Sequence, residues 1–585
     1  MTDPRDPEAQ EPENPTQNGQ SDQAQSDQPL SRREAREAEA RAADADATQA
    51  LPAFTPGGEP TELMREFPPV GATELFPGFP TASAIDADAA SPAAGATELI
   101  PRAAASDSAA AATKPPALAG IFATMSRHPK AWLFSALTVA FVLLGTGAVF
   151  AGVAVGSSES ATADVAPAAS ATATTPPPRP TPTAVADPTH LRTCSIAAKA
   201  ADPNLLSFEG SVINATTGEV LFDRNGATPS RTASVLKTLT AAAALAVLGP
   251  DYQLTTKVVA GSAPGSIVLV GGGDPTLSAG NGSVYAGAPT LGTLATEVKA
   301  AWAKLHPDGE PITSLVLDAT MWNPDDNWDP SWQRSEQTEG YQPEVTALMV
   351  DGSHANPRAQ DSPRSNDPVG DAGKAFATAL GISDLTISTG AAPAGTETLG
   401  AVQSQPVRTL IGQMLPVSDN TLAEMLARVT SKVAGNDGSS ASLATVIPNA
   451  LKSYGLNPAG VVIKDGSGLS NNDAVPATFV AQLMAKVAAG GQNLNIIYDA
   501  LPIAGKTGTL AGRFTGANAI ARGAVNAKTG WIKTEYSLAG VIHAADGTLL
   551  SFAFYALGAI NSKTQPALDT ITTAAFSCGN NLSNN

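Results

Sequence analysis

The sequence predicts a mixed α/β (α+β) fold for its C-terminal two-thirds, in which an antiparallel sheet is flanked by helices. Two strand-like runs separated by Ala-Thr-Thr predict a hairpin near the start of this region. An Ala- and Leu-rich run over residues 234–248 predicts a helix directly after it. Three more strand-like runs near the end predict an antiparallel meander. The strand-like runs are residues 207–214, 218–222, 523–532, 536–543 and 549–557.

The first part of the chain differs from this region in composition. Residues 1–118 hold 20 acidic and 8 basic side chains among Ala-, Pro-, Ser- and Gln-rich stretches, so they contribute -12 of the formal charge of -19. Such a segment cannot bury enough apolar surface to offset its chain entropy, which predicts a disordered acidic tail. The remaining chain is mildly acidic with no basic face, which argues against binding to nucleic acid.

Residues 131–156 contain no charge over 26 positions. At ~1.5 Å per helical residue this run can cross a hydrocarbon core of ~30 Å, which predicts a transmembrane helix. Arg127, His128 and Lys130 precede it and Glu159 follows, so the tail is expected in the cytoplasm and the rest outside a cell membrane crossed once. A cleaved signal peptide is the rival interpretation, but the preceding segment is far too long for its charged start.

Residues 157–190 are rich in Pro, Ala, Thr and Ser and include the string Pro-Pro-Pro-Arg-Pro-Thr-Pro. This composition predicts an extended linker, which at ~3.1 Å per residue would reach up to ~100 Å from the bilayer. That reach suits a substrate layered outside the membrane. A linker with no tuned reach is equally compatible with the sequence.

The chain has two cysteines, Cys194 and Cys578, at the two ends of the predicted globular region. Both fall on the side expected to be exported, where oxidising conditions favour disulfides. Because the termini of a domain often lie close together, we expect a bridge between them. Two thiols that never meet are the alternative.

Three short strings carry the candidate chemistry. They are Ser234-Val-Leu-Lys237, Ser418-Asp419-Asn420 and Lys528-Thr529-Gly530. In a helix Lys237 lies one turn after Ser234 on the same face, so hydroxyl and amine can meet. In an extended inter-helix loop, Ser418 and Asn420 would point the same way. Each string has a structural alternative, since Ser and Asx residues commonly cap helices and a Ser-x-x-Lys arises by chance.

The third string has a competitor, because Lys506-Thr507-Gly508 also fits. Lys528 lies in a strand-like run that opens the meander, whereas Lys506 is followed by a loop-like segment. We therefore assign the site lysine to Lys528. Gly530 removes a side chain where a substrate backbone is expected against the strand edge.

With these strings in order, residues 205–578 resemble the D-alanyl-D-alanine carboxypeptidase/endopeptidase family of low-molecular-mass penicillin-binding proteins. Further runs resemble the family's other signatures, in its order: Gly271-Gly-Gly-Asp-Pro-Thr-Leu277, Asp465-Gly-Ser-Gly-Leu-Ser470, Gly508-Thr-Leu-Ala-Gly-Arg-Phe514 and Ser537-Leu-Ala-Gly540. The resemblance implies a penicillin-binding transpeptidase-like fold with a helical subdomain. Residues 191–251 and 405–580 would form the peptidase domain, with an inserted mixed module at 252–404.

The resemblance also implies roles. Ser234 would be acylated, with Lys237 as its base, made less basic by burial and by Lys528. Ser418 would relay a proton and Asn420 would orient the substrate amide. Lys528 with Thr529 would hold the terminal carboxylate, and the main-chain N–H groups of Ser234 and Trp531 would form an oxyanion hole. Trp531 departs from the family pattern, which places a small hydroxyl residue there, so carboxylate binding is in question.

The predicted activity is a serine D,D-carboxypeptidase acting on peptidoglycan peptides that end in D-Ala-D-Ala, with endopeptidase cleavage of crosslinks left open and β-lactams as covalent inhibitors. A β-lactamase of the same fold and a relic wall-binding or sensor protein are the alternatives. No cofactor or metal is expected, because the five histidines lack zinc-ligand spacing and no Gly-x-Ser-x-Gly elbow is present.

Overall fold

The computed structural model describes residues 191–280 and 282–584. The predicted tail (1–118), transmembrane helix (131–156) and linker (157–190) lie outside the described residues. Among the residues that the structure describes, no helix has both the length and the apolar character needed to cross a bilayer.

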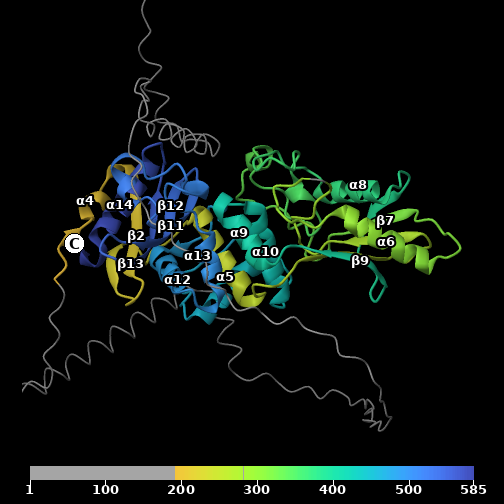
Figure 1. The fold of residues 1–585 in the computed structure, drawn as a ribbon, viewed down its shortest axis with the longest axis horizontal. Helices are drawn as coiled ribbons and strands as arrows, with labels where there is room; N and C mark the ends of the chain where they lie inside the picture. Colours follow the sequence, from red (N-terminus) through yellow and green to blue (C-terminus); the bar gives the residue numbers. More distant parts are fainter. Residues whose placement is uncertain (1–190, 281, 585) are drawn as a thin grey trace, which may run out of the picture. The chain divides into compact units, whose positions relative to one another are not determined.

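The first sheet joins the two ends of the described chain. Its strand order is β11-β12-β13-β2-β3, with every neighbouring pair antiparallel. The predicted hairpin and meander are therefore both confirmed, and β13 pairs with β2 across more than 300 residues of sequence (Figure 1). The strands are β2 (Ser207–Asn214), β3 (Val220–Arg224), β11 (Val525–Ile532), β12 (Glu535–His543) and β13 (Leu549–Leu557).

Both faces of this sheet are covered, as the alternation of side chains along β13 shows. Ala553 and Tyr555 join one apolar cluster, together with residues of α12 (Ala477–Ala489). Phe552 and Phe554 join a second cluster, together with residues of α14 (Thr564–Cys578). Because successive side chains of a strand point to opposite faces, a continuous apolar run fills both layers.

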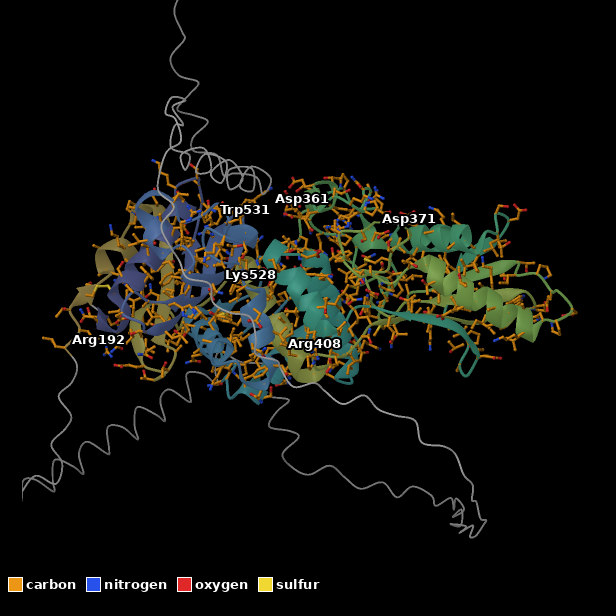
Figure 2. The ribbon with its side chains drawn as sticks, viewed as in Figure 1. Arg192, Asp361, Asp371, Arg408, Lys528 and Trp531 are labelled. Atoms are coloured by element: carbon orange, nitrogen blue, oxygen red, sulfur yellow. A yellow bond between two sulfur atoms is a disulfide. The ribbon has the colours of Figure 1, made fainter. Side chains whose placement is uncertain are left out.

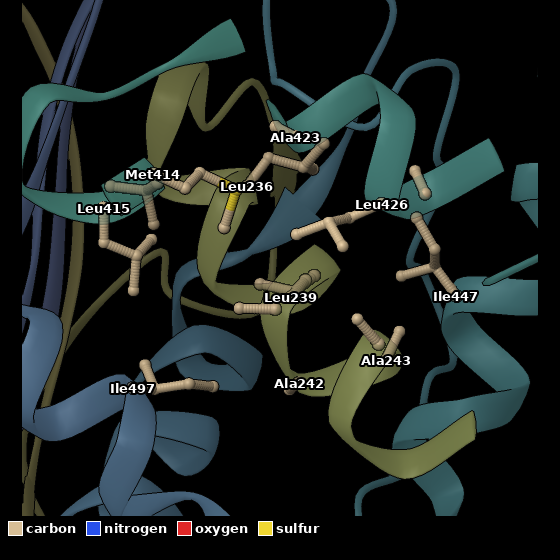
Figure 3. Close-up of a cluster of buried hydrophobic side chains, with 14 of the residues drawn as sticks. Leu236, Leu239, Ala242, Ala243, Met414, Leu415, Ala423, Leu426, Ile447 and Ile497 are labelled. Carbon is tan, nitrogen blue, oxygen red and sulfur yellow. The ribbon is translucent and has the colours of Figure 1, made fainter. Parts of the chain in front are cut away.

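A group of helices packs beside the sheet and forms the larger apolar core. Figure 3 shows side chains from several of these helices meeting there, with Leu239 and Ala243 of α5 facing Leu426 and Ile447. Most of α5 is buried, which its small Ala residues permit because they let neighbouring helices approach closely. The helices are α5 (Lys237–Val247), α9 (Val407–Val417), α10 (Asn420–Val433), α11 (Ser440–Leu451) and α13 (Asn495–Ala500).

A second, mixed sheet lies between α5 and α9 in the sequence. Its order is β8-β7-β6-β5-β9, with β6, β7 and β8 parallel and the β5 pairs antiparallel. Helices α6 (Leu291–Leu305) and α8 (Pro368–Leu380) share its apolar cluster. The strands are β5 (Thr255–Ala260), β6 (Ser266–Val270), β7 (Ser314–Asp318), β8 (Thr386–Thr389) and β9 (Thr398–Gln403).

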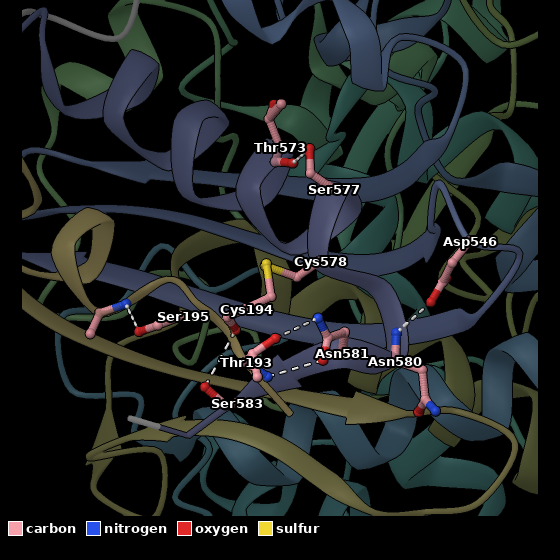
Figure 4. The surroundings of a disulfide bond; sticks show 11 residues. Thr193, Cys194, Ser195, Asp546, Thr573, Ser577, Cys578, Asn580, Asn581 and Ser583 are labelled. Carbon is pink, nitrogen blue, oxygen red and sulfur yellow. Dashed lines mark hydrogen bonds between the residues drawn. A yellow bond between two sulfur atoms is a disulfide. The ribbon is translucent and has the colours of Figure 1, made fainter. Parts of the chain in front are cut away.

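The ends of the described chain are tied together. A disulfide joins Cys194 to Cys578, whose Cα atoms lie 5.5 Å apart (Figure 4). Beside it, β1 pairs in parallel with β14. Short elements complete the fold: β1 (Cys194–Ser195), β4 (Pro229–Ser230), β10 (Val475–Pro476), β14 (Leu582–Ser583), α4 (Ala197–Ala200) and α7 (Ser335–Thr338).

Candidate active site

Ser234 and Lys237 meet at the start of the buried helix. The expected regular helix begins instead as a 3₁₀ turn, η2 (Ala233–Leu236), and Lys237 is the first residue of α5. Side chains three residues apart eclipse one another in a 3₁₀ turn, so this geometry brings them together. The Nζ of Lys237 lies 3.0 Å from the Oγ of Ser234.

Two further acceptors surround the same amine. Lys237 Nζ donates to Asn420 Oδ1 at 2.7 Å and to the main-chain oxygen of Ser467 at 2.6 Å. A neutral amine has two N–H groups, which these acceptors would take, and one lone pair, which would then face the Ser234 hydroxyl. The arrangement is therefore suited to removing the proton of that hydroxyl.

The Ser418-Asp419-Asn420 string is a tight junction between helices, not the extended loop we expected. Ser418 ends α9 in the left-handed conformation (φ 62°, ψ 44°), and Asp419 caps α10 by accepting from Leu422 N at 2.9 Å. This turn sends the two flanking side chains to different lysines. Ser418 Oγ accepts from Lys528 Nζ at 2.8 Å, while Asn420 contacts Lys237.

Lys528 lies on β11, the edge strand of the first sheet, and its Nζ also donates to the Thr529 oxygen at 2.8 Å (Figure 2). Along this strand the N–H of Ala527 bonds outward to Pro502. The main-chain groups of Thr529 and Trp531 follow the same alternation and point to the outer edge. A peptide could add to this edge as a further strand.

Gly530 and the competing Lys506-Thr507-Gly508 string have different surroundings. A side chain at Gly530 would strike the Oγ of Ser537 and the main-chain oxygen of Thr232, so the glycine makes room for the segment before Ser234. The competing Lys506 is exposed in a loop. Its neighbour Thr509 nevertheless reaches the site, with its Oγ1 2.8 Å from that of Thr529.

The side chains of the candidate site are withdrawn from solvent. Ser234 is 2% exposed, and Lys237 and Lys528 are fully buried. A small hollow lies beside the junction of α9 and α10, where Ser418 and Asn420 contact the two lysines. It is lined by Ser418, Asp419 and Asn420 and, from the region of the second sheet, by Tyr341, Gln360, Asp361 and Arg364. The segment predicted to be an inserted module (252–404) thus borders the candidate site.

The sequence analysis missed a buried carboxyl group on α10, that of Glu424. Glu424 follows Asn420 by one turn of α10, and its two oxygens accept from Gly466 N at 3.0 and 3.1 Å. Burial, reinforced by the neighbouring Asp465 carboxylate, raises the pKa of Glu424 to about 8. Glu424 is therefore protonated and uncharged at neutral pH.

Replacing Glu424 with glutamine is expected to change how stability depends on pH. Between its ordinary value of 4.5 and about 8, Glu424 holds a proton in the folded state that the unfolded chain has released. The wild type therefore loses stability as pH rises through this window, relative to a variant that cannot titrate. The pH-dependent loss in the free energy of unfolding of the wild type, relative to the variant, should be small at pH 5 and on the order of 4 kcal/mol at pH 8. Denaturant unfolding at both pH values measures it, and identical pH dependence in the two proteins would contradict it.

Two residues of the 252–404 segment also contact the site motifs and carry no local signal in the sequence. The hydroxyl of Tyr285 donates to Asp419 Oδ2 at 3.1 Å, and the indole Nε1 of Trp332 donates to Asp465 Oδ2 at 2.8 Å. Both donors are more than 100 residues away from their acceptors in the sequence. From the sequence, an aromatic residue between predicted elements is interpreted as an ordinary core residue. Only the tertiary contacts distinguish Tyr285 and Trp332 from other such residues.

Comparison with known proteins identifies the family of this chain. Residues 193–363 and 353–575 match the model of the D-Ala-D-Ala carboxypeptidase 3 (S13) family. A carboxypeptidase of Mycobacterium tuberculosis is 34% identical over 399 residues, covering 66% of this chain and 84% of its own. Carboxypeptidase DacB of Mycolicibacterium smegmatis is 34% identical over 394 residues, with the same shares covered. Penicillin binding protein 4 of Haemophilus influenzae has a similar fold, with a TM-score of 0.51 at 18% identity over 63% of this chain and 94% of its own.

Proposed function

This chain belongs to the D-Ala-D-Ala carboxypeptidase 3 (S13) family and is a serine D-alanyl-D-alanine carboxypeptidase, and on that premise we propose that Ser234 is its acylated nucleophile. The observation that supports this assignment is the buried 3.0 Å contact between Ser234 Oγ and Lys237 Nζ. The fully buried amine has two other acceptors placed to take its N–H groups.

The reaction then runs in two stages. As Lys237 takes its proton, Ser234 Oγ bonds to the carbonyl carbon of the penultimate D-alanine. The peptide C–N bond breaks, and the terminal D-alanine leaves as an amine after receiving a proton through Lys237 or Ser418. Water next attacks the ester on Ser234, and the shortened stem peptide is released.

Substrate orientation is assigned to the other motif residues. Asn420 holds the lysine and faces the hollow, so it is placed to orient the substrate amide. Lys528 supplies a positive charge beside Ser418, which suits a terminal carboxylate, with Thr529 on the same strand. The main-chain N–H groups of Ser234 and Trp531 are the proposed oxyanion hole. The Trp531 side chain supplies no hydroxyl, so carboxylate binding falls more heavily on Lys528 and Thr529.

One experiment tests this function against its alternatives. The purified full chain is incubated with uncrosslinked and crosslinked muropeptides, and separately with a labelled penicillin. We expect release of D-alanine and a penicillin adduct on Ser234 that lasts for minutes. Rapid turnover of the penicillin would favour a β-lactamase, and muropeptide binding without D-alanine release would favour a relic wall-binding protein. Cleavage of the crosslinked substrate would add endopeptidase activity.

The enzyme is also proposed to be anchored in the cell membrane. The uncharged run at 131–156, with basic residues before it and acidic residues after it, supports a single span with the catalytic part outside. The full chain should then remain with membranes after alkaline carbonate extraction. Its recovery in the soluble fraction would refute the anchor without touching the proposed chemistry.

A further inference from the structure

The carboxylate of Asp465 organises the loop that touches the catalytic pair. One oxygen accepts from Ser467 N at 3.0 Å and Gly468 N at 2.5 Å, and the other accepts from Ser470 N at 2.7 Å. Asp465 is 1% exposed, so water does not compete for these bonds. The backbone of residues 465–470 is therefore held in one conformation by one side chain.

This loop positions both members of the candidate pair. The Ser467 oxygen accepts from Lys237 Nζ at 2.6 Å. Gly468 packs so closely that an added Cβ would lie 1.9 Å from the main-chain oxygen of Ala233, the residue before Ser234. A shift of this loop would thus move two groups together: the Ser467 oxygen that accepts from Lys237, and Gly468, which packs against the residue before Ser234.

One donor to Asp465 comes from outside the loop. The indole Nε1 of Trp332, which is 5% exposed, donates to Asp465 Oδ2 at 2.8 Å. Its neighbour Ser331 lies with Oγ 2.7 Å from Ser470 Oγ, at the other end of the same loop. Two adjacent residues, Ser331 and Trp332, therefore hold the loop by hydrogen bonds at two points.

We propose that Trp332 is a positioning residue for acylation: its indole N–H holds Asp465 and, through the 465–470 loop, keeps the Ser467 oxygen on Lys237. The inserted region thereby contributes to the chemistry as well as lining the hollow. The inference rests on the proposed function, because it takes Ser234 and Lys237 as the reacting pair.

The chain offers a matched pair of variants. Trp332→Phe removes the N–H and keeps an aromatic ring, whereas Trp328→Phe makes the same change in the edge-on partner ring 5.3 Å away. The Nε1 of Trp328 donates to the main-chain oxygen of Trp332 at 3.4 Å, and not to Asp465. The second-order rate of acylation by a labelled penicillin should fall about 10- to 100-fold in Trp332→Phe and stay within about twofold in Trp328→Phe.

Two readouts separate positioning from general damage. For a D-Ala-D-Ala peptide, the loss in Trp332→Phe should appear in kcat with KM little changed. The acidic limb of the acylation pH profile should also move to lower pH, because Lys237 loses an acceptor that favours its ammonium form. The charged or titratable groups around the loop and the pair include Glu424, Asp473 and Arg428, together with Lys464 directly before the loop and Lys528 as the second amine of the site. Both variants leave all of them in place.

A second variant guards against misfolding. Ser331→Ala deletes the contact to Ser470 without opening the core, and should slow acylation severalfold. If both Phe variants melt like the wild type and acylate at its rate with its pH profile, Trp332 has no positioning role. If Trp332→Phe does not fold, an unchanged rate in Ser331→Ala overturns the proposal. A wild type that is never acylated on Ser234 would refute the proposed function instead.

Discussion

Replacing Ser234 with alanine is expected to lower D-alanine release by at least about 10³-fold and to abolish the covalent penicillin adduct. The 3.0 Å contact between Ser234 Oγ and Lys237 Nζ joins the proposed nucleophile to its proposed base. Without the hydroxyl, no ester can form, and residual hydrolysis would rely on direct attack of water on the peptide bond. Chromatography of muropeptide products and intact-protein mass spectrometry measure the two effects.

The matched control is Ser551→Ala. Ser551 is a buried serine on β13, in the first sheet but outside the candidate site, so its loss should leave both readouts near the wild type. Substrate binding should survive in Ser234→Ala because the residues assigned to orientation remain. An adduct that persists in Ser234→Ala would place the nucleophile elsewhere and remove the basis of the mechanism.

Replacing Lys528 with alanine should have the second largest effect, a loss of about 10²- to 10³-fold in kcat/KM. The buried ammonium of Lys528 contacts Ser418 Oγ and the Thr529 oxygen, so its removal takes away the positive charge proposed for the substrate carboxylate and a partner of the proposed proton relay. Hydrolysis of a D-Ala-D-Ala peptide over a range of concentrations measures it.

Lys506→Ala is the control for this second change, because the same three-residue string occurs there. Lys506 is exposed in a loop, so we expect activity within about twofold of the wild type. Thermal unfolding of both variants shows whether the buried lysine is also needed for folding. The opposite ranking of the two variants would transfer the substrate-binding role to the 506–508 string.

Local patterns in the sequence determined much of the fold. The hairpin of β2 and β3 and the meander of β11, β12 and β13 follow from runs of β-branched and aromatic residues between turn residues. The buried helix α5 follows from its run of Ala and Leu. These features depend on neighbours a few residues apart, so they can be predicted without knowing the rest of the structure. The three motif strings were located in the same way, by short spacing.

The tertiary structure alone decided how the motifs meet. The left-handed turn at Ser418 sends Ser418 to Lys528 and Asn420 to Lys237, a division that a spacing of two residues does not indicate. It also decided that Gly530 accommodates the chain before Ser234, and that Glu424 is buried enough to raise its pKa. These outcomes depend on packing between segments far apart in the chain. The spacing of residues in the sequence does not indicate which of these segments come within a few ångströms of one another. Local propensity therefore specified the parts, and the burial of polar groups among distant partners specified the site.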